Sequence, residues 1–156
     1  MKSFTTAASV LLAAMVAIVS VGNAEEAAEK VTTVKCPVAG KEIKIADAKT
    51  VSYKKANVYV CCGKCKAAME KDSKKFATKA NHQLIQTKQA KQVKCPLSGG
   101  SVNAEQNVKV AGVKVGFCCG KCKAKVAGAE GDEQLELVFS EDAFKKGYEV
   151  KEKKAE

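Results

Sequence analysis

The sequence of 156 residues contains no tryptophan and no arginine, only two prolines and one histidine, and just five phenylalanines and three tyrosines. So few aromatic side chains cannot fill a large core or line a large pocket, which argues against an ordinary enzyme. Without arginine, bidentate guanidinium contacts to nucleic-acid bases are impossible. The lysines are spread along the chain, so we interpret the net charge of +10 as a solvated surface and expect no nucleic-acid partner.

The first 24 residues have the layout of a secretory signal peptide. Lys2 supplies a positive charge, residues 7–21 form an uncharged apolar run, and small residues precede an acidic start at Glu25. The apolar run is shorter than the roughly 20 residues that span a bilayer. We therefore expect cleavage after residue 24, export to the periplasm or the exterior, and no membrane span in the mature chain.

The remaining sequence contains two copies of one cysteine-rich unit. The segment VKCPVAG of residues 34–40 recurs as VKCPLSG at 93–99, and CCGKCKA of 61–67 recurs identically at 118–124. All eight cysteines and both prolines lie in these segments. The expected organisation is a signal peptide at 1–24, a linker at 25–32, repeats at 33–90 and 91–150, and a charged tail at 151–156.

The hydrophobic pattern predicts a β-hairpin in each repeat. Alternating residues indicate strands at 51–53 and 57–61 in the first copy, and at 108–110 and 113–118 in the second, with a turn at Ala111-Gly112. The expected fold class is α+β, with two small tandem repeats that each contain a Cys-Pro turn, a β-hairpin and a helix.

The segments after the cysteine clusters predict different helices in the two copies. A helical face in the first copy carries Ala68, Met69, Phe76 and Ala80. In the second copy Gly128 shortens the corresponding helix, residues 134–139 alternate as a strand, and Ser140 is expected to cap a short helix. Gln83 is expected to correspond to Gln134, and His82, which has no counterpart, is expected on the surface.

Small units with so little apolar material usually need disulfides or a metal ion for stability, and four cysteines per repeat can supply either. A disulfide framework suits an oxidising compartment. Cys62-x-x-Cys65 and Cys119-x-x-Cys122 also fit a thioredoxin-like redox motif. We favour a metal site, because Cys36 and the downstream cluster offer four soft thiolates at a strand-to-helix junction.

At these residues the chain resembles the YHS and TRASH group of small metal-binding domains. The resemblance rests on Cys-Pro-x-x-Gly, a hairpin ending in Val-Tyr-Val-Cys or Val-Gly-Phe-Cys, and Cys-x₃-Cys running into a helix. It implies a treble-clef or ribbon-like scaffold, a role in heavy-metal handling, and two ligand sets: Cys36, Cys61 and Cys65, and Cys95, Cys118 and Cys122. Relatives often have a second cysteine in the first turn, where this chain has Ala39 and Ser98. The additional Cys62 and Cys119 would supply the missing ligand or pair with another thiol.

We therefore expect an exported, non-enzymatic protein that binds or buffers Zn²⁺ or Cu⁺, two ions per chain, and we expect its partner to be an envelope metal-handling protein. The alternatives are a disulfide-stapled interaction module without metal and, third, a thiol-disulfide oxidoreductase. No paired carboxylates, activated nucleophile or phosphate-binding loop supports catalysis. The expected metal-site residues are Cys36, Cys61, Cys62, Cys65, Cys95, Cys118, Cys119 and Cys122.

Overall fold

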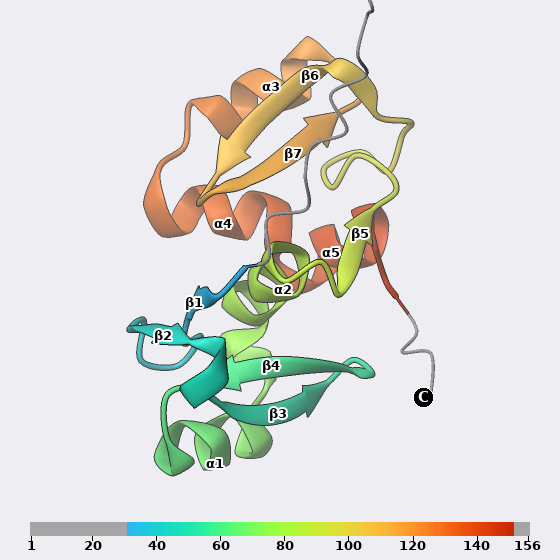
Figure 1. The fold of residues 1–156 in the computed structure, drawn as a ribbon. Coiled ribbons are helices and arrows are strands. Elements are labelled where there is room, and N and C mark those ends of the chain that lie inside the picture. Colours follow the sequence, from blue (N-terminus) through green and yellow to red (C-terminus); the bar gives the residue numbers. More distant parts are fainter. Residues whose placement is uncertain (1–30, 152–156) are drawn as a thin grey trace, which may run out of the picture.

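The computed structural model describes residues 31–151. The expected signal peptide, residues 25–30 of the linker and residues 152–156 of the tail lie outside this part of the chain. The described residues form short antiparallel strand pairs and five α-helices, which confirms the α+β class (Figure 1). Within residues 31–151, no helix has both the length and the apolar character needed to cross a membrane.

The first half of the chain begins with two strand pairs and ends in helices. Strand β1 (Thr33–Lys35) pairs with β2 (Glu42–Lys44), and β3 (Lys49–Tyr53) pairs with β4 (Ala56–Val60), with a 3₁₀ turn, η1 (Ile45–Asp47), between the pairs. The helices are α1 (Gly63–Lys71) and α2 (Ala77–Gln86), separated by a 3₁₀ turn, η2 (Lys74–Phe76).

The second half has one long hairpin, three helices and a strand pair that joins its first strand to its last. Strand β6 (Asn103–Val110) pairs with β7 (Val113–Phe117), and β5 (Ala90–Gln92) pairs with β8 (Tyr148–Val150). The helices are α3 (Gly120–Ala127), α4 (Gly131–Phe139) and α5 (Glu141–Gly147). The expected boundary between residues 90 and 91 lies inside β5, which pairs with the last strand of the chain.

Both predicted hairpins are present. Each turns through two residues with positive φ, Lys54 and Lys55 in the first and Ala111 and Gly112 in the second. This backbone matches the right-handed twist of the flanking strands. Alternate residues of β4 are buried, as the sequence pattern predicts.

The prediction of a single helix after the first cysteine cluster is wrong, because the structure has two helices there. Helix α1 ends at Lys71. The backbone of the next residue, Asp72, leaves the helical region, and its carboxylate accepts a hydrogen bond from the amide of Lys75 at 3.3 Å. Met69 in α1 and Ala80 in α2 are both fully buried, so the predicted apolar residues reach the core from separate helices.

The strand predicted at 134–139 is also wrong, because these residues belong to α4. Leu135, Leu137 and Phe139 satisfy an alternating pattern, but Leu135, Val138 and Phe139 satisfy a helical one equally well. Acidic residues in the first turn favour the helix. The short helix predicted after Ser140 is present as α5.

Helix α2 lies at the centre of the molecule, between the β3–β4 hairpin and α4 (Figure 1). Three consecutive polar residues of α2 are buried: Asn81, His82 and Gln83. The expected surface position of His82 is therefore wrong. Its Nε2 lies 3.1 Å from the carbonyl of Ala111, and its ring packs edge-on against Phe139.

Candidate metal centres

Each Cys-Pro segment forms a tight turn that presents one buried thiol. The carbonyl of Lys41 accepts a hydrogen bond from the amide of Cys36, and the amide of Gly40 donates to the carbonyl of Cys36, both at 2.8 Å. Gly40 has a φ of +69°, a conformation that a side chain would strain. The turn therefore fixes Cys36 at a defined point beside β1.

The second Cys-Pro segment makes the same backbone contacts. Cys95 donates to the carbonyl of Gly100, and the amide of Gly99 donates to the carbonyl of Cys95, again at 2.8 Å. Gly99 has a φ of +74°. The two segments thus share local geometry as well as sequence.

The downstream cysteines lie where a strand gives way to a helix. Strand β4 ends at Val60, and α1 begins at Gly63, so Cys61 and Cys62 occupy the junction and Cys65 lies in the first turn of the helix. In the second half, β7 and α3 place Cys118, Cys119 and Cys122 in the same way.

These elements bring three thiols together in each half. The Sγ atoms of Cys36, Cys61 and Cys65 all lie within 4.8 Å of one another, as do those of Cys95, Cys118 and Cys122. We call these sets the first and second triads. The Cys61–Cys65 distance is 3.5 Å and the Cys118–Cys122 distance is 3.7 Å. A tetrahedral ion about 2.3 Å from each thiolate keeps its sulfurs about 3.8 Å apart, so the spacing suits a thiolate-bound metal.

The remaining thiol of each half lies beside its triad without joining it. Cys62 Sγ is 3.8 Å from Cys61 Sγ, and Cys119 Sγ is 3.7 Å from Cys118 Sγ. Both residues have extended backbone and occupy the position that precedes a helix. The structure therefore gathers all eight predicted residues in two clusters, with six of them in the mutually close triads.

The thiols in each cluster differ in burial. Cys36 and Cys95 are fully inaccessible, and Cys65 is 8% exposed. The thiols that are partly accessible are Cys61, Cys62, Cys118 and Cys122, and Cys119 is exposed. The Cys-Pro turn therefore forms the inner wall of each cluster, and the second cluster is more open to solvent than the first.

Backbone amides favour a thiolate at the inner cysteine of the first triad. Burial opposes ionisation of Cys36, but hydrogen bonds from the amides of Ala39, Cys61 and Val38 hold its pKa below the usual value. Burial and the neighbouring thiols Cys61 and Cys62 raise the pKa of Cys65 to about 12. Cys36 therefore loses its proton more readily than Cys65. A metal that binds the triad would displace the protons from the thiols that still carry them.

The second triad has an additional donor, the hydroxyl of Ser98. Burial opposes ionisation of Cys95, but the hydroxyl and amide of Ser98 and the amides of Cys118 and Leu97 lower its pKa to about 6. Ser98 Oγ also lies 3.1 Å from Cys118 Sγ. The first triad has Ala39 at the corresponding position, so the two sites differ in their polar surroundings.

All eight cysteines are free thiols in the structure, and none forms a disulfide. Thiolates are soft ligands that select Zn²⁺ and Cu⁺ over hard cations such as Mg²⁺ or Ca²⁺. The donor set therefore fits the predicted class of metal.

Two glutamines that support the clusters were not recognised as functional from the sequence. Gln83 makes paired hydrogen bonds to the backbone of Tyr59, and Gln92 makes paired bonds to Gly116. Gln134, the expected counterpart of Gln83, instead donates to the carbonyl of Val126. In the sequence, the only sign that glutamines bind the backbone here is their density around the predicted boundary between the repeats.

Comparison with protein-family models, curated proteins and solved structures found no match to this chain. The resemblance to the YHS and TRASH group therefore stays a prediction from the cysteine motifs.

Proposed function

We propose that the protein is an exported, non-enzymatic metal-binding protein with one Zn²⁺ or Cu⁺ ion at each cysteine triad. The observation that carries this proposal is the close approach of three sulfur atoms in each half, within 4.8 Å of one another. The three thiols of each triad come from two segments that are distant in the sequence, and together they offer a metal the soft donor set that Zn²⁺ or Cu⁺ prefers.

The surrounding groups support metal binding in a defined way. The amides of the Cys-Pro turn donate to Cys36 and Cys95, which orients each sulfur and favours the anionic form that a metal requires. The N-terminus of the following helix adds partial positive charge beside the other thiols. The ion, when bound, links the Cys-Pro turn to the strand–helix junction and supplies the stapling that a small core needs.

The wider interpretation follows from the same residues. We interpret the two halves as tandem repeats of a YHS/TRASH-like, treble-clef or ribbon-like unit, and residues 1–24 as a signal peptide. In that setting the protein would buffer a soft ion outside the cytoplasm and exchange it with an envelope metal-handling protein.

Native mass spectrometry of the protein purified from its own compartment tests this proposal. We expect two equivalents of metal and loss of helical circular dichroism on chelation. Two-dalton mass losses would instead reveal disulfides. A reduced, metal-free protein that remains fully folded would contradict the proposal.

Single substitutions then assign the ligands. Cys36→Ser is expected to remove one equivalent and Cys95→Ser the other, because each changes a different triad. The matched control is Ser73→Ala, a half-buried position outside both triads, which should retain two equivalents. The same titration applied to Cys61→Ser and Cys118→Ser completes the ligand assignment.

A further inference from the structure

Each cluster has one thiol that the triad does not use. Cys62 and Cys119 lie directly beside triad cysteines, at sulfur–sulfur distances of 3.8 and 3.7 Å. They are far more accessible than Cys36 and Cys95, which form the inner wall. Cys61, Cys118 and Cys122 are partly accessible too, and Cys62 and Cys119 are the accessible thiols beside each triad that the triad does not use.

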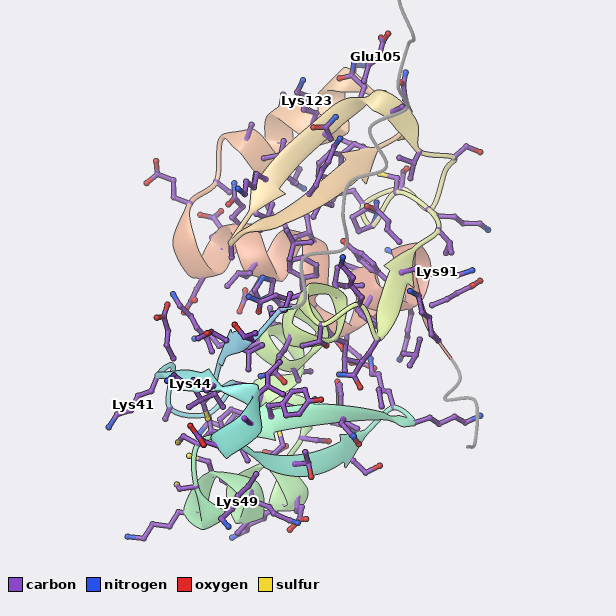
Figure 2. The ribbon with its side chains drawn as sticks, viewed as in Figure 1. Lys41, Lys44, Lys49, Lys91, Glu105 and Lys123 are labelled. Atoms are coloured by element: carbon purple, nitrogen blue, oxygen red, sulfur yellow. The ribbon has the colours of Figure 1, made fainter. Side chains whose placement is uncertain are left out.

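The surroundings of these thiols are basic. The segments 61–69 and 118–129 contain lysines but no acidic residue. Lys64 and Lys121 follow the two thiols closely and are exposed, and neither pairs with an acidic side chain of the described residues. Elsewhere in the first half Lys41, Lys44 and Lys49 are also exposed, in a segment that carries the exposed acids Glu42 and Asp47 as well, and Lys123 projects from α3 in the second half (Figure 2).

We propose that Cys62 and Cys119 are exchange ligands that pass metal between the triads and an anionic, thiol-bearing acceptor. This inference rests on the proposed metal-binding function and names the chemistry of the exchange partner. The lysines attract the negative charge of the acceptor, and the accessible thiol bridges the distance between the buried triad and the acceptor thiol.

The exchange requires no electron transfer. Cys62 forms a metal–sulfur bond as one triad bond breaks, and the acceptor thiol then displaces the remaining protein thiolates one at a time. Each incoming thiol loses a proton, and each released protein thiolate takes one up, so charge and protons balance. Because Cys119 is exposed and Cys62 is only partly accessible, exchange should be faster at the second site.

Zinc transfer from the loaded full-length chain tests this inference. The acceptors are dimercaptosuccinate, a dithiol with two carboxylates, and dithiothreitol, an uncharged dithiol, with transfer followed by stopped flow. Cys62→Ser and Cys119→Ser should still bind two equivalents of zinc but should slow transfer at their own site by about tenfold. Transfer at the unchanged rate would overturn the inference.

Charge variants test the choice of acceptor. Lys121→Glu should slow transfer to dimercaptosuccinate and leave transfer to dithiothreitol unchanged. The control is Lys114→Glu, which changes an equally exposed lysine near the tip of the β6–β7 hairpin and should change neither rate. Equal effects of both variants would overturn the specific role of the lysine beside Cys119.

Two further outcomes separate this inference from the proposed function. If Cys62→Ser loses one equivalent of zinc, Cys62 is a permanent ligand and the exchange role is overturned while metal binding stands. If the wild-type chain takes up no zinc before any acceptor is added, metal binding itself is overturned and the exchange role with it.

Discussion

Gln83 holds both polar backbone groups of Tyr59. The amide N–H of Tyr59 donates to Gln83 Oε1 at 2.6 Å, and Gln83 Nε2 donates to the carbonyl of Tyr59 at 2.9 Å. The same side-chain amide also donates to the carbonyl of Lys35 at 3.0 Å. Because Lys35 precedes Cys36 and Tyr59 lies in the strand that leads to Cys61, one residue of α2 sets the relative position of two triad segments.

Gln83→Leu is expected to lower the free energy of unfolding by about 2 kcal/mol or more, because it leaves backbone groups of Tyr59 without buried partners. Urea denaturation of the metal-loaded protein measures the loss. The comparison variant is Gln92→Leu, which removes the equivalent bonds to Gly116 from a more accessible position and should cost less. If Gln83→Leu is as stable as the wild type, the glutamine does not secure the triad.

The parts of the fold that the sequence predicts are those that depend on local signals. The hairpin turns need positive φ, and Ala111-Gly112 between alternating residues indicates one directly. The Cys-Pro turns need Gly40 and Gly99, and both residues stand in the repeated motif. The two triads are implied by the family resemblance rather than by local signals, because Cys36 and Cys61 meet only through the packing of distant segments.

The parts that the sequence does not predict depend on contacts between distant residues. Strand β5 is only three residues long and exists because β8 pairs with it from the far end of the chain. His82 is buried because the tip of the second hairpin supplies the carbonyl of Ala111. For α4, the apolar residues fit two periods, and packing against α2 rather than the local pattern decides between them.

The two glycines of the Cys-Pro turns provide a test of the scaffold. Gly40→Ala should destabilise the metal-loaded protein by about 1–2 kcal/mol, because an alanine at φ +69° is strained although no atom lies near its Cβ. The control is Gly63→Ala at the start of α1, where the site is equally open and φ is not positive, so little change is expected. Thermal unfolding compares the two, and equal melting temperatures would contradict the role of the turn.

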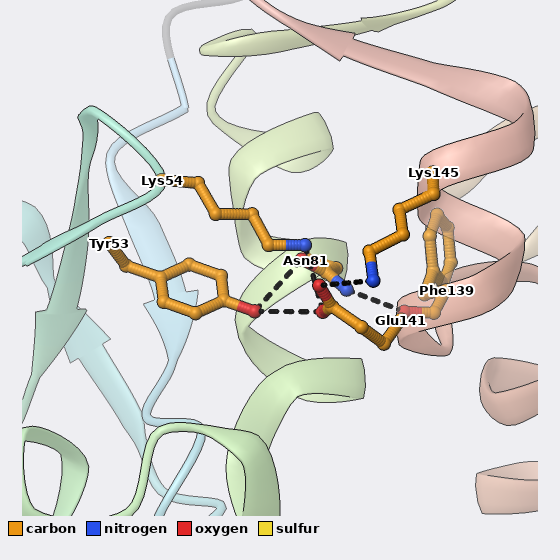
Figure 3. A network of polar contacts seen from close by, with 6 residues as sticks. All are labelled: Tyr53, Lys54, Asn81, Phe139, Glu141 and Lys145. Carbon is orange, nitrogen blue, oxygen red and sulfur yellow. Dashed lines mark hydrogen bonds and ion pairs between the residues drawn. The ribbon is translucent and has the colours of Figure 1, made fainter.

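A polar network joins the first hairpin to α5 (Figure 3). Lys54 pairs with Glu141 at 2.8 Å, the hydroxyl of Tyr53 reaches both Glu141 and Asn81, and Asn81 donates to the carbonyl of Phe139 at 2.9 Å. Lys54 also lies 4.4 Å from the centre of the Phe144 ring. These contacts connect residues that are far apart in the sequence and fix the two halves relative to each other.

Glu141→Gln is therefore expected to cost about 1 kcal/mol of unfolding free energy, a loss that should shrink at high salt. Urea denaturation at low and high ionic strength measures both effects. Glu149→Gln is the control, because its pair with Lys91 at 3.7 Å is more exposed and should contribute almost nothing. Equal losses in the two variants would show that the network has no special role.

The buried imidazole of His82 makes stability depend on pH. Burial of the ring lowers the pKa of His82 more than the hydrogen bond to the carbonyl of Ala111 raises it, and the charge of Lys35 lowers it further. The folded protein therefore keeps the ring neutral, whereas in the unfolded chain His82 takes up a proton near its ordinary pKa of 6.5. Above that pH the contribution of His82 to stability is complete, and it is lost as the pH falls from there through the lowered pKa of the folded state.

His82→Gln should abolish this part of the pH dependence, because the amide cannot titrate but can still donate to the carbonyl of Ala111. Urea denaturation of metal-loaded wild type and variant at pH 7.5 and at pH 5 gives the difference in stability at each pH. Proton competition at the thiols affects both proteins alike and cancels in the comparison. The wild type should lose more stability than the variant on acidification, and parallel losses would mean that the buried histidine has no part in the acid sensitivity of the fold.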